Sequence, residues 1–199
     1  NVDEKYSKLY SDNPNVPNAD FYGMITNIDE NMGRLVAKLN ELGLAKNTIV
    51  IFMSDNGANK TGDNSPFSGY KGNLFEGGIR VPCIVKWPGV LARGAVSNQP
   101  CMTMDFSRSI VVAVGAKPPA GRAFDGMDIL RATATNRPVR KRTLFWRARR
   151  AERTRKAVRD GSLKYISLHD GGDVKEYLFD LERDPAEKNN LFDEKPENV

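Results

Sequence analysis

The clearest hydrophobic pattern in the chain is a helical one near its start. Apolar side chains recur three and four residues apart there, and they are Met24, Ile25, Ile28, Met32, Leu35, Val36, Leu39 and Leu42. This spacing predicts an amphipathic helix over residues 20–43. Asp20 is the predicted N-cap residue, and Gly43 is the glycine predicted just beyond the helix end.

Two apolar runs after this helix predict strands. Residues 48–54 read TIVIFMS, a continuous run that is typical of a parallel strand covered on both faces. Residues 79–89 hold a second run with Pro82 and Pro88 near its ends, which favours a position close to a sheet edge. A helix followed by a buried strand indicates a layered α/β fold.

The second half of the chain is patterned differently. Residues 103–116 predict another helix, and residues 116–143, rich in Pro, Gly, Ala and Arg, predict a long connection. Three short apolar runs then predict the strands of a small antiparallel sheet, at residues 143–148, 163–167 and 176–181. We therefore predict an α/β domain over residues 1–136 and a small C-terminal α+β subdomain with an antiparallel sheet over residues 137–199.

The composition is that of an ordinary globular protein. Its 199 residues, 40% hydrophobic and 28% charged, suffice for one sizeable domain and exclude a fibrous or wholly disordered class. No apolar run approaches the roughly 18 residues of a membrane span, so no membrane partner is expected. The first ten residues lack the basic start and apolar stretch of a secretion signal, so they indicate no compartment.

Positive charge is concentrated in one segment. The formal net charge is +5, but residues 137–159 contain eleven Lys and Arg residues against Glu152 alone. One interpretation is a binding site for an anionic partner such as a sulfated glycan or a nucleic acid. The interpretation that we favour is a solvated helix face beside a strand.

The two cysteines and the single histidine do not indicate a catalytic or metal site. Cys83 and Cys101 form no CxxC pair, and we expect two buried thiols in preference to a disulfide or a metal site. His169 stands in the sequence LHDGG, and we expect it to be a surface or turn residue.

The segment that follows the first predicted strand holds the most suggestive polar residues. Open α/β sheets bind ligands just beyond the carboxyl ends of their strands, where Asp55 and Asn56 lie. Their carboxylate and amide oxygens are ligands that Ca²⁺ or Mg²⁺ prefers, and Gly57 lets the backbone turn away. The alternative is structural, because Asn-Gly is a common turn sequence and Asp often caps a loop.

Lys71 lies between two glycines later in this segment. Its ammonium group suits an oxyanion, although surface lysines without such a role are far more common. Glu76 precedes a Gly-Gly bend and Arg80 enters the next strand. We expect Glu76 and Arg80 to form a buried ion pair that braces the loop.

Several of these motifs occur together in a recognisable order. Residues 24–57, 69–89, 125–130 and 177–191 closely resemble the C-terminal part of a type I sulfatase, a family within the alkaline-phosphatase-like superfamily. The resemblance runs from about residue 22 to the end. It implies part of the alkaline-phosphatase-like sheet with flanking helices.

The resemblance also implies an activity and roles for three residues. Asp55 and Asn56 correspond to ligands of the calcium ion at the sulfatase active site. Lys71 corresponds to the catalytic lysine that binds the oxygens of the sulfate ester substrate. The implied enzyme is a sulfuric ester hydrolase, with a sulfated glycan as a candidate substrate and a periplasmic or secreted location.

Other parts of a sulfatase site do not occur in this sequence. The family's formylglycine nucleophile is made from Cys/Ser-x-Pro-x-Arg, and no such pentapeptide is present. The paired upstream Asp ligands and the active-site histidines are also absent. Because Ca²⁺ takes roughly 6–8 oxygen ligands, we expect an incomplete calcium site and no activity from this chain alone. We expect a missing N-terminal portion, or self-association, to cover the exposed sheet.

Two alternatives to a sulfatase fragment are open. The first is a non-catalytic module that binds an anionic partner through residues 137–159, where a nucleic acid is the less favoured partner. The second is a phosphodiesterase or phosphatase relative. Those sites generally hold two transition metals through several histidines, which a single histidine cannot supply.

Overall fold

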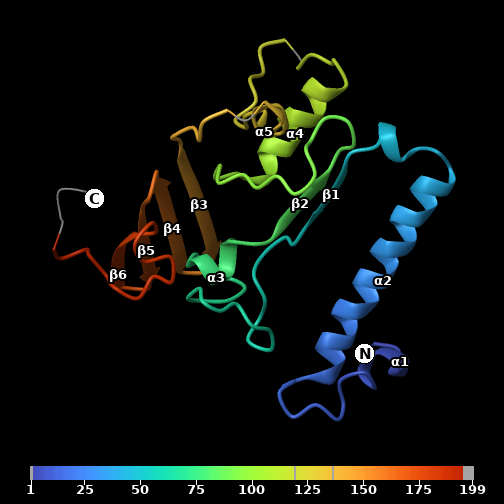
Figure 1. Ribbon diagram of the computed structural model, residues 1–199. Coiled ribbons are helices and arrows are strands. Elements are labelled where there is room, and N and C mark those ends of the chain that lie inside the picture. The colour runs from blue at the N-terminus through green and yellow to red at the C-terminus, as the bar shows by residue number, and fades with distance from the viewer. Residues whose placement is uncertain (1, 119, 136, 195–199) are drawn as a thin grey trace. The chain divides into compact units, whose positions relative to one another are not determined.

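The computed structural model describes residues 2–118, 120–135 and 137–194, which form an α/β fold with two sheets (Figure 1). The helices are α1 (Glu4–Ser7), α2 (Ala19–Glu41), α3 (Glu76–Ile79), α4 (Thr103–Ala113) and α5 (Ile129–Ala134), with a 3-10 turn at Ala45–Asn47. A two-stranded sheet contains β1 (Val50–Met53) and β2 (Cys83–Lys86). A four-stranded sheet contains β3 (Thr143–Arg150), β4 (Arg153–Asp160), β5 (Leu163–Asp170) and β6 (Asp173–Asp180).

The chain divides into two compact units, each assembled from segments that are distant in sequence. The first unit contains Asn1–Glu41, Phe52–Ile84 and Lys141–Val199. The second contains Leu42–Ile51 and Val85–Arg140. The division at residue 136 that the sequence suggests stays a prediction.

The long helix predicted near the start is confirmed as α2. Its N-cap is Asn18, because Asn18 Oδ1 accepts a hydrogen bond from the backbone N–H of Phe21 at 2.9 Å, so the assignment of the cap to Asp20 was wrong. Gly43 follows the helix end with a φ of +69°, as predicted. The helix α1 packs against α2, and Tyr6 Oη donates to Glu30 Oε2 at 2.5 Å.

Both strands predicted in the first half are confirmed, as β1 and β2. The expectation that the first one is covered on both faces was wrong, because no residue of β1 is fully buried. Phe52 is 39% exposed, and Ile84 of β2 is 63% exposed. A two-stranded sheet has too few neighbours to bury its strands.

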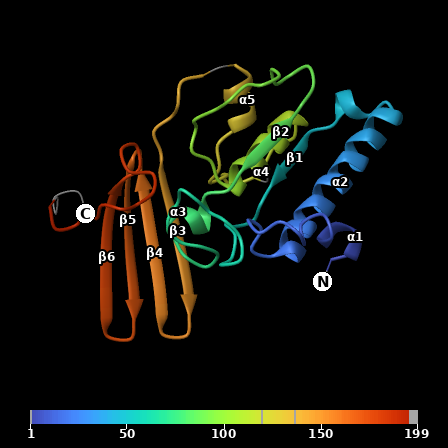
Figure 2. The ribbon, with the colours of Figure 1, turned by 60° about the horizontal axis from the view of Figure 1, so that its bottom comes forward.

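The four strands of the larger sheet are antiparallel and lie in chain order, β3-β4-β5-β6 (Figure 2). The three strands predicted in this region are confirmed, but β4 was missed. The helix expected in the basic segment is wrong, since that segment forms the hairpin of β3 and β4. β4 has one fully buried residue, Ala157, and backbone hydrogen bonds to two neighbouring strands define it as a strand.

One face of this sheet packs against the segment that contains α3. The buried residues of this core are Leu74, Ala157, Ile166, Phe179 and Leu181. Phe75 and Ile79, at the ends of α3, pack against them. The loop before α3 is therefore attached to the sheet by apolar contacts.

The second unit has a polar centre. The carboxylate of Asp105 on α4 is fully buried and accepts from the backbone N–H groups of Met102, at 2.6 Å, and Met127, at 2.8 Å. Ser109 Oγ accepts from the N–H of Ile129 at 3.0 Å. These bonds hold α5 beside α4, so the connection predicted over residues 116–143 contains a short helix.

The remaining single-residue predictions have mixed outcomes. Cys83 and Cys101 are exposed, so the expectation of buried thiols was wrong. His169 lies on β5 and is half-buried, with Nε2 at 2.8 Å from Ser167 Oγ, so it is not a turn residue. Among the described helices, none is long and apolar enough to cross a membrane.

Candidate functional site

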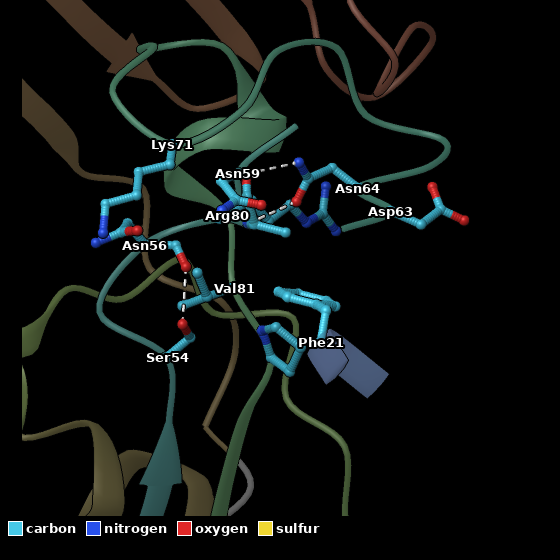
Figure 3. Close-up of a pocket in the computed structure, with 12 residues that line it drawn as sticks. Phe21, Ser54, Asn56, Asn59, Asp63, Asn64, Lys71, Arg80 and Val81 are labelled. Atoms are coloured by element: carbon cyan, nitrogen blue, oxygen red, sulfur yellow. Dashed lines mark hydrogen bonds between the residues drawn. The ribbon is translucent and has the colours of Figure 1, made fainter. Parts of the chain in front are cut away.

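A cavity of about 400 Å³ lies in the first unit, beyond the end of β1. Its lining includes Ser54, Asn56, Asn64, Lys71 and Arg80 (Figure 3). These residues belong to the segment between β1 and β2. The cavity therefore lies where the sequence predicts a site.

Two backbone contacts shape the segment around the cavity. The N–H of Gly57 donates to the carbonyl of Gly78 at 3.0 Å, and the N–H of Lys71 donates to the carbonyl of Ala58 at 2.9 Å. A Cβ atom on Gly57 would lie 1.8 Å from the carbonyl oxygen of Gly77. Glycine is therefore required at position 57 for space.

Asn64 holds the loop in place and was not identified from the sequence. Its Oδ1 accepts from the N–H of Ala58 at 2.8 Å, and its Nδ2 donates to the carbonyl of Ala58 at 3.0 Å.

The neighbouring Asp63 accepts from the N–H of Ser65 at 2.7 Å. Hydrogen bonds from the hydroxyl and N–H of Ser65 lower the pKa of Asp63. For the hydrogen bonds between Asn64 and Ala58, the sequence offers only the general tendency of asparagine to form turns.

The structure brings Asn56 and Lys71 to the same cavity. Both residues line it, although 15 positions separate them in the sequence. In the view of Figure 3 the Lys71 side chain extends toward Asn56. Lys71 is exposed, and no carboxylate among the described residues lies within ion-pair distance of its ammonium group.

Asp55 lies beside the cavity, without lining it. Its side chain is exposed, and its Oδ2 accepts from Nδ2 of Asn56 at 2.5 Å. Ser54 Oγ donates to the carbonyl of Asn56 at 2.8 Å, which orients the start of the loop (Figure 3). The carboxylate and the amide are thus adjacent side chains with a direct contact.

Asp55 and Asn56 have the type of ligand atom that a calcium ion prefers, but they are too few to complete its coordination shell. Both side chains offer oxygen donors, which Ca²⁺ prefers. Within residues 2–118, 120–135 and 137–194, however, no group of three or more His, Cys, Asp or Glu side chains could hold a metal. These two residues can supply only part of a shell of roughly 6–8 oxygens.

The start of α3 is held by a buried charge cluster. Lys164 Nζ on β5 lies 2.8 Å from Glu76 Oε1 and 2.8 Å from Glu187 Oε1. Glu187 Oε2 accepts from the backbone N–H of Glu76 at 2.6 Å. Burial raises the pKa of the Glu187 carboxyl, and the ammonium group of Lys164 opposes this shift.

The predicted pair of Glu76 and Arg80 is present but is secondary. Arg80 Nη1 lies 3.5 Å from Glu76 Oε2, and the Arg80 side chain is half exposed. Lys164, fully buried and 88 residues from Glu76, is the closer partner. The sequence contained no signal for this contact, because the sheet brings the two residues together.

The loop that contains Lys71 wraps closely around α3. The N–H of Gly77 donates to the carbonyl of Ser68 at 2.7 Å. A Cβ atom on Gly78 would lie 2.3 Å from the carbonyl oxygen of Asn73. The guanidinium group of Arg155 on β4 donates to the carbonyl of Gly72. The loop is therefore held on both sides of Lys71, at Ser68 by α3 and at Gly72 by the sheet.

Two family models match the chain. The model described as "Sulfatase" matches residues 2–116. The model described as "N-sulphoglucosamine sulphohydrolase, C-terminal" matches residues 69–198. Together they span both units, including the segment from β1 to β2.

Individual proteins show the same similarity. N-acetylgalactosamine-6-sulfatase of Mus musculus is 43% identical over 112 residues, which are 53% of this chain and 22% of that protein. Steryl-sulfatase of Mus musculus is 40% identical over 116 residues, 53% of this chain and 19% of that protein. The chain thus spans about a fifth of the length of these curated relatives.

A solved structure matches nearly the whole chain. The crystal structure of Ps i-CgsB in complex with k-i-k-neocarrahexaose superposes with a TM-score of 0.87 and 26% identity. The match covers 98% of this chain and 44% of that one.

Proposed function

The chain belongs to the sulfatase family, with its alkaline-phosphatase-like fold, and we propose that it supplies part of a site that hydrolyses sulfate esters. The observation that supports this proposal is the cavity lined by both Asn56 and Lys71. One residue offers an oxygen donor and the other a cation without a carboxylate partner in the described part of the chain. The oxygen donor can help to hold a calcium ion and the ammonium group can hold the sulfate oxygens, so each would bring positive charge to a sulfate ester.

Lys71 is the proposed substrate-binding and catalytic residue. Hydrolysis replaces the bond from sulfur to the alcohol oxygen with a bond to an oxygen from water, and the alcohol oxygen gains a proton. The sulfate oxygens carry negative charge throughout. An ammonium group aimed at them stabilises the transition state most where bulk water is excluded.

Asp55 and Asn56 are the proposed calcium ligands of this chain. Sulfatases are generally calcium-dependent. A bound Ca²⁺ would supply positive charge next to the sulfate oxygens. The contact between Asp55 and Asn56 holds the two side chains together before any ion is bound. The other oxygen ligands would come from outside these residues.

The nucleophile is proposed to come from another polypeptide segment. The sequence contains no Cys/Ser-x-Pro-x-Arg, and a lysine with two oxygen donors cannot attack sulfur by itself. We propose a sulfated glycan as the substrate class. The name of the murine N-acetylgalactosamine-6-sulfatase and the neocarrahexaose bound to Ps i-CgsB support that choice.

Mutations in a protein that joins this chain to a segment with the nucleophile motif test the proposal. We expect Lys71→Ala to lower kcat/KM by an amount that corresponds to a loss of on the order of 2–4 kcal/mol of transition-state stabilisation, which is typical for one oxyanion contact. Asp55→Ala should abolish calcium-dependent turnover. Lys60→Ala, an exposed lysine of the same loop, is the matched control and should leave the rate unchanged. An unchanged rate for Lys71→Ala or Asp55→Ala would refute the assignment.

A further inference from the structure

The register of the four-stranded sheet divides the basic segment between two faces. Residues directly opposite each other on antiparallel strands share a face. Trp146 and Ala157 are opposite each other and pack in the core against α3, so their face is the α3 face. Arg147 lies opposite Lys156, one position along, and the pair therefore points to the other face, which we call the outer face.

Three basic residues on the α3 face, Arg153, Arg155 and Arg159, have partners within the chain. Arg153 Nε lies 2.8 Å from Asp170 Oδ2. Arg155 donates to the carbonyl of Gly72, and Arg159 Nε donates to the carbonyl of Gly161 at 2.9 Å. These side chains stabilise the sheet and its neighbouring loops.

The basic residues on the outer face differ. Arg147, Arg149 and Lys156 are exposed, and none has a carboxylate within 4.0 Å in the described part of the chain. Glu176 is in the same row as Arg147 and Lys156, but Ser167 separates it from Lys156, and its carboxylate accepts from the Tyr165 hydroxyl.

Arg147 and Lys156 are like charges in directly opposite positions. Such a pair destabilises a sheet unless an anion lies between the two groups. Phe145 is on the same face, two residues from Arg147, and its side chain is 70% exposed. An exposed ring beside two cations offers a flat apolar surface together with positive charge. An anion bound at the outer face would reduce the repulsion between Arg147 and Lys156.

We propose that the outer face of β3 and β4 binds a sulfated polysaccharide at a site separate from the cavity of Lys71. Residues two positions apart on a strand are about 7 Å apart along the backbone, and neighbouring strands are about 5 Å apart, so the three basic side chains start from closely spaced positions that suit a polymer with repeated sulfate groups. Such binding is distinct from the proposed hydrolysis, because it needs neither the nucleophile nor Lys71.

A nucleic acid fits this face less well. Proteins that bind single strands usually stack successive bases on several aromatic rings, whereas Phe145 is the exposed aromatic ring on the outer face of β3 and β4. Duplex DNA is read by an element that enters a groove, whereas these side chains lie on the face of a four-stranded sheet.

Binding of dextran sulfate to the 199-residue chain tests the proposal, with uncharged dextran as the reference polymer. The test variant is R147Q/R149Q/K156Q, and the matched control is R150Q/R153Q/R159Q, which removes the same charge from the α3 face of the same strands. We expect the test variant to lose at least about tenfold in affinity at low salt, and the control less than about threefold. The slope of log affinity against log salt should fall by about two to three only in the test variant.

Equal losses in the two triple variants would overturn the proposal, because net charge alone would then explain binding. Equal or tighter binding of a single-stranded oligonucleotide would also overturn it. Lys71→Ala should lower dextran sulfate affinity much less than the test variant does, and a loss as large as that of the test variant would place the polymer in the cavity instead. Circular dichroism checks that each variant is folded. If the triple test variant does not fold, R149Q alone replaces it as the test variant.

Discussion

Gly57, in the loop between β1 and β2 that contains the site, packs directly against α3. Its N–H donates to the carbonyl of Gly78, and a Cβ atom in its place would lie 1.8 Å from the carbonyl oxygen of Gly77. Real side chains do not approach a backbone oxygen so closely. The position of Asn56 therefore depends on the absence of a side chain at the next residue.

We expect Gly57→Ala to lower the free energy of unfolding by on the order of 3 kcal/mol, because the loop or α3 must shift to make room. Gly33→Ala is the matched control, since it lies in α2 with open space around its Cβ position. That variant should raise stability by about 0.5–1 kcal/mol. Urea denaturation measures both, and equal stability of Gly57→Ala and wild type would contradict the close approach.

At the scale of elements, α3 is attached to the sheet by apolar packing and by the cluster of Glu76, Lys164 and Glu187. Burying a charge costs several kcal/mol unless it is paired and hydrogen-bonded. Here one ammonium group faces two carboxylates, and both contacts are 2.8 Å long. Removal of the ammonium group would leave two buried carboxylates close together.

We expect Lys164→Met to lower the free energy of unfolding by about 3–5 kcal/mol, as loss of one partner of a buried ion pair typically does. Lys38→Met is the matched control, because its partner Glu41 and Lys38 itself are exposed. That change should alter stability by less than about 0.5 kcal/mol. Urea denaturation measures the free energy of unfolding of both variants. Comparable effects of the two substitutions would mean that the cluster does not stabilise the fold.

At the scale of the whole molecule, apolar surface remains exposed along α2. Ile25 and Ile28 are each 50% exposed, and Leu35 is 49% exposed. Contiguous exposed apolar side chains are typical of surfaces that contact another polypeptide. This agrees with a chain that spans about a fifth of the length of its relatives.

We expect the purified 199-residue chain to show no hydrolysis of a small aryl sulfate, with or without added calcium. The physical reason is that charge stabilisation without an activated nucleophile does not break the sulfur–oxygen bond at a useful rate. Spectrophotometric release of the phenol measures this, and a chelator-treated sample is the control. Robust turnover that calcium stimulates would disprove the division of the site between segments.

Local patterns in the sequence determined part of this fold. The spacing of apolar residues predicted α2, and the end of an apolar run marked the start of the site loop at Asp55 and Asn56. Both features depend on neighbours within a few positions, so a single sequence carries them. The sequence also identified Lys71 as a candidate site residue, but only the folded loop places it in the same cavity as Asn56.

The tertiary structure decided the rest, because those contacts join residues that are distant in sequence. Glu76 meets Lys164, 88 residues away, more closely than it meets Arg80, since the fold brings β5 into contact with α3. β4 exists because two neighbouring strands pair with it, although its own residues are mostly basic. The same pairing decides which arginines find a partner and which remain available to bind an anion, since strand register assigns each side chain to a face.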